Sequence, residues 1–202
     1  TGEAHQLRLS LEKVSGKDLN WFFNQWYFGK GYPKLEVKST FDPMKKQVTI
    51  NVAQTQEEKF EFPLSIDVLE NGKISRKEVW VTAKAKNDFV FDVTKNPELI
   101  NANPEGLLLS DIKQDKTPEQ LFLQYTTAKD LYSKYTAIEE AKDQVSKNPF
   151  ADKLYAAALK DKFYRNRLLA LEGLPEDPKS FLADVEKLAQ NDEKNLVKGA
   201  AI

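Results

Sequence analysis

The spacing of the hydrophobic residues changes twice along this chain of 202 residues. Before Pro33 they recur every three or four positions, then they alternate, and after Thr117 the helical spacing returns. A period of 3.6 residues is typical of amphipathic helices, and a period of two is typical of half-buried strands. The sequence therefore predicts a multi-part α and β fold. A short helical segment (1–32) is followed by an antiparallel β-sandwich (33–113) and an α-helical repeat region (114–202).

The first predicted helix covers most of the first 14 residues. Leu7, Leu11 and Val14 share one face at helical spacing, and Thr1 is a plausible cap. His5, the single histidine of the chain, lies at the start of this helix. We interpret it as a solvated helix residue rather than a catalytic base, because no partner for it is recognisable nearby.

The second predicted helix is unusually aromatic. Ser15 and Asp18 have the spacing of a capping box, which would end the first helix and start the second. Six aromatic residues follow: Trp21, Phe22, Phe23, Trp26, Tyr27 and Phe28. Gly29 and Gly31 can adopt a left-handed helix end, and Pro33 prevents continuation. We expect a helix buried between domains and covered on more than one side, with an aromatic ligand site as the alternative.

About seven strands are predicted in the middle of the chain. The alternating runs are residues 35–41, 48–52, 60–68, 79–81 and 89–93, and residues 107–109 form a short buried run. Asn71 and Gly72 predict a type I′ hairpin between two of these strands. Pro63 predicts an edge strand or a bulge, since proline cannot donate a ladder hydrogen bond. Many short antiparallel strands without helical interludes favour a β-sandwich.

Several helix starts are predicted after a polar linker at residues 101–116. Thr117, followed by proline and then Gln120, has the pattern of a capped helix start. Asn148 and Asp177 are each followed by proline in the same way, and the capping pattern of Thr127 with Asp130 three residues later divides the first helical stretch in two.

A repeat is visible in these helices. Three short segments share a basic residue followed by an alanine at a fixed offset: Lys134 and Ala137, Arg167 and Ala170, and Lys198 and Ala201. The alanines are 33 and 31 residues apart. Such a period of helix pairs is typical of HEAT or armadillo repeats. Because Ile202 falls on an apolar helix face without a polar closing repeat, we expect the natural protein to continue and the helical domain to be truncated.

Composition narrows the classes of function. The net charge of −1 provides no electrostatic argument for nucleic acid as a partner. No apolar run approaches the roughly 20 residues of a membrane span. The absence of cysteine excludes disulfides and thiolate metal sites within the chain. Neither a zinc-peptidase HExxH motif nor a nucleotide-binding glycine motif occurs. We therefore assign no catalytic, cofactor-binding or metal-binding residue to this chain.

Five tyrosines cluster in the helical part: Tyr125, Tyr132, Tyr135, Tyr155 and Tyr164. We interpret them as core residues with hydroxyl groups at the rim, because tyrosine presents an apolar ring and a polar end. The alternative is that they line a groove for an extended peptide.

One long segment resembles a known family. It contains Ser15, Gly16, Lys17, Asp18 and Leu19, then Trp21, Phe22, Phe23 and Trp26, then residues 31–37 with the sequence GYPKLEV. This order resembles the segment SGxDL…FF…W…GYPxLxV of M1 (gluzincin) zinc aminopeptidases. There it joins the catalytic domain to a β-sandwich. Phe122, Gln124 and Tyr125, and Tyr135, Ala137, Ile138 and Glu139, are similar to the start of the helical domain in bacterial members.

The resemblance implies a function for the parent protein rather than for this chain. It implies a C-terminal region downstream of the HExxH centre, with zinc held by the catalytic domain of the full-length parent. The parent would remove N-terminal amino acids from peptides, and this chain would contact its catalytic domain and cover the active site. The alternative is a catalytically inert adaptor, in which a β-sandwich and an α-solenoid bind protein partners.

Overall fold

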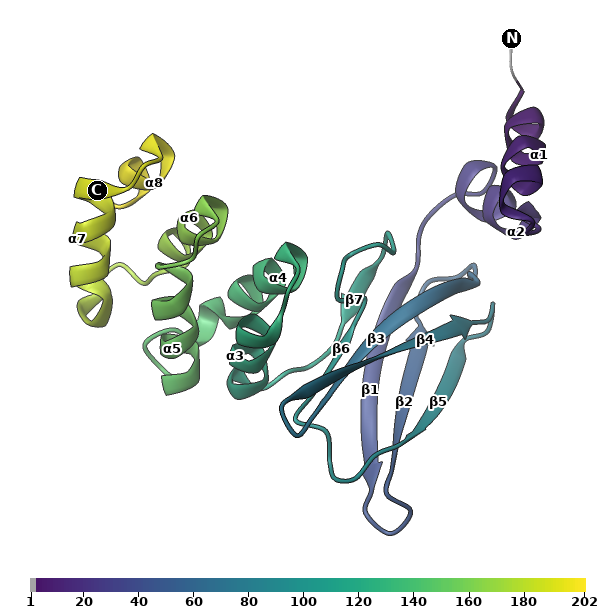
Figure 1. Ribbon diagram of the computed structural model, residues 1–202, viewed down its shortest axis with the longest axis horizontal. Helices are drawn as coiled ribbons and strands as arrows, with labels where there is room; N and C mark the ends of the chain where they lie inside the picture. The colour runs from purple at the N-terminus through teal and green to yellow at the C-terminus, as the bar shows by residue number, and fades with distance from the viewer. Residues whose placement is uncertain (1–2) are drawn as a thin grey trace.

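The computed structural model describes residues 3–202 and shows a mixed α and β chain (Figure 1). The N-terminal segment contains α1 (Ala4–Ser15), α2 (Asn20–Phe22) and the π-helix η1 (Phe23–Tyr27). The strands are β1 (Lys34–Asp42), β2 (Gln47–Gln54), β3 (Phe62–Glu70), β4 (Lys73–Val81), β5 (Lys86–Asp92), β6 (Leu99–Ala102) and β7 (Asp111–Lys113). The remaining helices are α3 (Pro118–Thr127), α4 (Leu131–Ala141), η2 (Lys142–Gln144), α5 (Pro149–Ala158), α6 (Tyr164–Glu172), η3 (Lys179–Phe181), α7 (Leu182–Asn191) and α8 (Asn195–Ala200).

The connection between α1 and α2 differs from the predicted capping box. Ser15 Oγ donates back to the Leu11 carbonyl at 2.7 Å, and Gly16, with φ of +68°, ends α1. Asp18 accepts a hydrogen bond from the Asn20 amide at 2.8 Å, and α2 begins after Leu19 without a side-chain cap. The box is wrong because the left-handed Gly16 breaks the helical register between Ser15 and Asp18. Thr1 lies outside the described residues.

The aromatic helix is one α-helical turn followed by a π-helical turn. The amide of Phe28 donates to the Phe23 carbonyl at 2.9 Å, which closes the wider turn. Gly29 does not adopt the predicted left-handed conformation, whereas Gly31 does, with φ of +83°. Glycine is required at position 29 for space instead, since an added Cβ would lie 2.5 Å from the Gln25 carbonyl oxygen.

The strands form two sheets, with orders β5-β2-β1-β7 and β4-β3-β6. All neighbouring strands are antiparallel except β1 and β7, which are parallel. Alternate residues of both sheets point into one hydrophobic core, which includes Val37, Ile50, Leu64 and Ile66. This alternation is the one that the sequence predicts for half-buried strands.

The hairpin between β3 and β4 is confirmed, with φ of +52° at Asn71 and +70° at Gly72. Pro63 lies in neither an edge strand nor a bulge. It pairs in regular register with Trp80 of β4, and β6 pairs with β3 only from Ile66 onward. Pro63 therefore has a neighbouring strand on one side only. Its missing N–H deprives no second strand of a hydrogen-bond donor.

The predicted strand at residues 107–109 is wrong. Leu107 and Leu109 are 80% and 69% exposed, in a loop. The chain instead forms β6, which overlaps the start of the region interpreted as a polar linker, and β7, which lies within that region. All four residues of β6 are buried, so β6 has no alternating pattern, and β7 has only three residues.

The helices that follow form successive pairs, α3–α4, α5–α6 and α7–α8, which extend away from the sheets (Figure 1). Thr117 and Asn148 cap α3 and α5 as predicted, and Asp130 caps α4. The predicted cap at Asp177 is wrong, because Pro178 precedes a short 3₁₀ turn that has no side-chain cap. Within residues 3–202, none of the helices combines the length and apolarity that crossing a bilayer requires.

The two sheets, β1 to β7, are called the β unit below. Gln54 is a buried polar residue that links several of its loops. Its Oε1 accepts from the Phe60 amide at 2.8 Å, and its Nε2 donates to the carbonyls of Phe60 and Thr82 at 2.7 and 3.1 Å. We expect Gln54→Leu to lower the free energy of unfolding by about 2–4 kcal/mol, because these buried backbone groups lose their partner. Urea denaturation measures the change. Gln47→Leu is the matched control, since Gln47 makes only an exposed bond to Asp92, and an equal loss in both variants would contradict this role.

Candidate functional site

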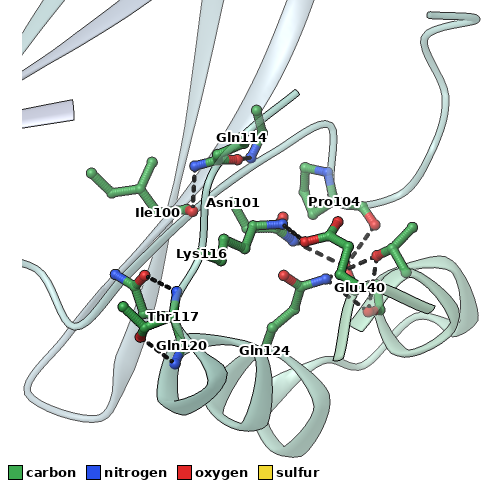
Figure 2. Close-up of polar contacts among 12 residues, drawn as sticks. Ile100, Asn101, Pro104, Gln114, Lys116, Thr117, Gln120, Gln124 and Glu140 are labelled. Carbon is green, nitrogen blue, oxygen red and sulfur yellow. Dashed lines mark hydrogen bonds and ion pairs between the residues drawn. The ribbon is translucent and has the colours of Figure 1, made fainter. Parts of the chain in front are cut away.

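Polar side chains at the base of the first helix pair join it to the β unit. Ser133 of α4 donates to the Pro104 carbonyl at 2.7 Å and accepts from Asn101 of β6 at 3.2 Å (Figure 2). Gln124 of α3 donates to the Ser133 carbonyl at 2.9 Å. All three side chains are buried, so each bond is formed away from water, where a lost partner is costly. The two helices are therefore held in one orientation on β6.

The chain that enters α3 contributes to the same junction. Gln114 pairs with the backbone of β6, accepting from the Ala102 amide at 3.2 Å and donating to the Ile100 carbonyl at 2.7 Å (Figure 2). The ammonium group of Lys116 reaches Glu140 of α4 at 3.5 Å. Burial lowers the pKa of Lys116, and the nearby Glu140 carboxylate partly opposes that effect. The strand-to-helix connection is thus tied to both elements that it joins.

At the other end of the β unit, the aromatic segment packs on the sheets with one side only. Phe23 is buried, Trp26 lies against Phe60 with ring centroids 5.4 Å apart, and Trp21 lies against Trp80 at 4.9 Å. The opposite side is open: Phe22, Tyr27 and Phe28 are 42%, 60% and 63% exposed.

Gln25 fixes this segment to the sheet in the manner of a strand neighbour. Its side-chain amide donates to the Glu61 carbonyl at 2.9 Å and accepts from the Glu61 amide at 2.7 Å. The open aromatic side of η1 is consequently held in place on the sheet. An exposed apolar area of this kind marks an interaction surface.

A groove of about 560 Å³ runs across the second helices of the three pairs. It is lined by the first turns of α4, by Phe163 and the length of α6, and by one residue of α8: Leu131, Tyr132, Tyr135, Phe163, Tyr164, Arg165, Asn166, Leu168, Leu169, Glu172 and Leu196. We call it the aromatic groove. Gly106 sets the position of its first ring, because a Cβ there would lie 2.8 Å from the ring carbons of Tyr132.

The five tyrosines of the helical part separate into two groups. Tyr125 and Tyr155 are buried, as predicted, and their hydroxyl groups donate to Asp161 at 2.6 Å and to the Ile138 carbonyl at 3.1 Å. Tyr132, Tyr135 and Tyr164 line the aromatic groove. These three therefore line a groove, and the binding of an extended peptide there stays a prediction.

Sequence patterns alone did not identify the other groove residues, although the sequence contains a periodic signal for them. Positions 131, 132 and 135 of the groove recur 33 residues later as 164, 165 and 168, the spacing already seen between Ala137 and Ala170. Apolar and aromatic rings with a few polar groups at the rim can hold an extended peptide or apolar side chains. Among the groove residues there is no side-chain nucleophile next to a general base.

Asp161, in the connection between α5 and α6, is the main electrostatic centre near this groove. Its carboxylate accepts from the Tyr125 hydroxyl at 2.6 Å, the Lys134 ammonium at 2.9 Å and the Phe163 amide at 2.8 Å. Burial raises the pKa of Asp161, but these hydrogen bonds outweigh it and lower the pKa to about 2. Three helices thus meet at one ionised carboxylate.

The absence of catalytic residues from this chain stays a prediction from the sequence. No three histidine or carboxylate side chains in residues 3–202 come together in a way that could hold a metal ion. His5 lies exposed on α1, with its Nδ1 3.1 Å from the Arg8 guanidinium.

Comparison with known proteins defines the fold. No family model matches the chain, and neither does any curated protein sequence. Among solved structures, the chain is similar to the crystal structure of Legionella pneumophila aminopeptidase A in complex with aspartic acid, with a TM-score of 0.67 and 18% identity. The match covers 98% of this chain and 24% of the Legionella chain. The chain therefore shares the fold of the matched part of that aminopeptidase, and it spans about a quarter of its length.

The buried carboxylate of Asp161 predicts a defined pH dependence of stability. Its pKa in the folded protein, about 2, is below the ordinary value of 3.8, so its contribution is complete above pH 4 and is lost as the pH falls toward 2. We expect Asp161→Asn to cost about 1–2 kcal/mol at pH 7 and to flatten the stability profile between pH 4 and 2. Urea denaturation across this range measures both effects. Asp177→Asn, in an exposed pair with Lys179, should change neither, and an unchanged profile for Asp161→Asn would refute the assignment.

Proposed function

We propose that this chain is the non-catalytic C-terminal region of a zinc-dependent metallo-aminopeptidase of the M1 (gluzincin) family. In this proposal the two sheets form its β-sandwich domain, and the helix pairs begin a HEAT-like domain that covers the active site. Zinc and the catalytic residues belong to a catalytic domain that contacts α1 and η1. The reaction is the removal of N-terminal amino acids from peptides.

The likeness to aminopeptidase A carries the proposal, because it extends over 98% of the chain rather than one common motif. The resemblance of residues 15–37 to the M1 junction segment is independent support, since it rests on residue order. These residues run from the end of α1 through α2 and η1 into β1, so they join the N-terminal helices to the first sheet. Two sheets over one core, followed by helix pairs, agree with the domain order of the family.

The exposed aromatic face supports a partner at the N-terminal end. Phe22, Tyr27 and Phe28 are held rigidly by the contacts of Gln25 and Trp26 while their own rings remain open. Burying an aromatic side chain is worth roughly 1.5–3 kcal/mol, so these rings favour a large apolar interface. A catalytic domain at this position would bury them.

The aromatic groove supports a role in holding substrate. The helices α4, α6 and α8 lie on the side of the molecule toward which α1 and α2 also extend from the sheets (Figure 1). A catalytic domain seated on α1 and η1 would therefore lie on the same side as the groove. In that arrangement the groove receives the part of a peptide that extends beyond the residue being removed.

The proposal predicts where activity is found. The gene upstream of Thr1 should encode HExxH and a second glutamate within a few hundred codons. The full-length protein should release amino acids from aminoacyl p-nitroanilides and lose this activity when zinc is chelated. Residues 1–202 alone should show none. A full-length protein without hydrolysis, or without the motif, would favour the inert adaptor, and zinc-dependent hydrolysis by residues 1–202 would refute the proposal.

The groove predicts a dependence on substrate length. In the full-length enzyme, Tyr135→Ala should raise KM about threefold to tenfold for peptides of eight or more residues, because an aromatic contact contributes about 0.5–1.5 kcal/mol. It should leave kcat/KM for an aminoacyl p-nitroanilide unchanged, since that substrate does not reach the groove. Met44→Ala, in an exposed turn, is the control. Equal effects on short and long substrates would place the groove outside the substrate path.

A further inference from the structure

A cavity of about 520 Å³ lies between the β unit and the first helix pair. One wall is the face of the sheet β4-β3-β6 that points away from the core of the β unit. The other wall consists of the end of α3, the α3–α4 connection and the start of α4. This cavity shares no lining residue with the aromatic groove. We call it the junction cavity.

The sheet wall carries two rows of side chains. Leu69 of β3 pairs with Ile74 of β4 and with Leu99 of β6, which gives an apolar row. Two residues earlier in β3, on the same face, Asp67 pairs with Arg76 of β4 and starts a polar row. All five residues line the junction cavity. A ligand that lies across both rows therefore meets an apolar surface at one end and charged groups at the other.

Carboxylates outnumber cations in the lining of the cavity. Asp67 and Glu105 share one partner, Arg76, at 2.8 and 2.7 Å. Asp130 is a third carboxylate, which caps α4 and forms no ion pair within residues 3–202. Lys129 is the second cation, and it is exposed. Three carboxylates and two cations give the lining a net charge of −1, which favours a ligand with a single positive charge.

Gln124 adds a buried acceptor that has no partner. Gln124 is 1% exposed, and its Nε2 donates to the Ser133 carbonyl and to the Thr136 hydroxyl, both at 2.9 Å. Figure 2 shows this nitrogen turned toward α4 and the oxygen turned away from it. The Oε1 atom accepts no hydrogen bond within residues 3–202. Because an unpaired buried acceptor is costly, a ligand that donates a hydrogen bond here would be stabilised.

The end of α3 also favours a cation. Thr127 and Ala128, at the C-terminal end of this helix, line the junction cavity. The C-terminal end of a helix carries a partial negative charge, which stabilises a positive group close to it. Asp130 follows two residues after Ala128, so its carboxylate and the helix end act on the same part of the cavity.

We propose that the junction cavity binds a small organic monocation, a primary ammonium group on a short aliphatic chain. An ammonium group donates three hydrogen bonds and accepts none, which matches Asp130 and the Oε1 atom of Gln124. The aliphatic chain lies on the apolar row beside Leu69. That row favours an organic cation over a metal ion, and no cluster of metal ligands occurs within residues 3–202. This inference rests on the lining of the cavity and does not depend on the aminopeptidase proposal.

Three ligands with the same chain and different head groups test the proposal. Hexylamine, which is protonated at pH 7, should bind the 202-residue chain with a Kd below about 1 mM. Hexanol should bind about tenfold more weakly, because it lacks the charge, and hexanoate should not bind detectably. Isothermal titration measures the affinities. In NMR spectra, hexylamine should shift the methyl signals of Leu69, Ile74 and Leu99.

Variants on the two walls identify the contacts. Asp130→Asn should weaken hexylamine binding about tenfold and leave hexanol unaffected, because asparagine keeps the helix cap and removes only the charge. Ile74→Thr, on an exposed position of β4, should weaken both ligands alike. Asp177→Asn, in an exposed pair with Lys179, is the matched control and should change neither affinity.

Three results would overturn the proposal. The first is equal binding of hexylamine, hexanol and hexanoate. The second is a set of NMR shifts at Tyr135 and Tyr164, which would place the amine in the aromatic groove. The third is a variant Asp130→Asn that has an unchanged urea midpoint and binds hexylamine as tightly as the parent chain does. If Asp130→Asn does not fold, an unchanged hexylamine affinity in Ile74→Thr has the same meaning.

Discussion

The arrangement of the molecule depends on the hydrogen bonds that Ser133 forms at the junction of the strands and helices. Its hydroxyl bonds both Pro104 and Asn101, its carbonyl accepts from Gln124, and its amide is capped by Asp130. A buried polar group that loses its partner costs about 1–3 kcal/mol, so rotating α4 on β6 would break several such bonds at once. The first helix pair is therefore directed by hydrogen bonds, whereas apolar packing alone would tolerate other angles.

The orientation of each later helix pair is set by its contacts with the pair before it. Lys134 and Arg167 each hold the connection of the next pair through a carboxylate that also accepts from the amide of the residue just before the second helix of that pair. Exposed ion pairs contribute little to stability, but these are largely removed from water, and losing one partner would leave a charge uncompensated. Repeating one contact places α4, α6 and α8 along one side, and the aromatic groove is a consequence of that repetition.

The N-terminal segment shows the opposite balance between local and distant forces. The helical spacing of its aromatic residues predicts one broad face, yet the chain forms a π-helical turn that divides these residues between two sides. Phe23 and Trp26 turn toward the core, whereas Tyr27 and Phe28 remain exposed. Neither the wider turn nor this division follows from helical spacing. Both depend on Phe60, Glu61 and Trp80, which lie more than 30 residues further along the chain.

The sequence by itself determined the features whose physics is local. The change of period located the strands and helices, Asn71 and Gly72 defined the hairpin, and Thr117 and Asn148 capped their helices. Tertiary structure alone decided β6, whose residues are buried on both faces and carry no period, and β7, which is too short to have one. It also decided which tyrosines are core and which line the groove. Tyr125 and Tyr135 have the same local preferences, but Tyr125 packs in the helical core and donates to Asp161, 36 residues further along, whereas Tyr135 lines the groove.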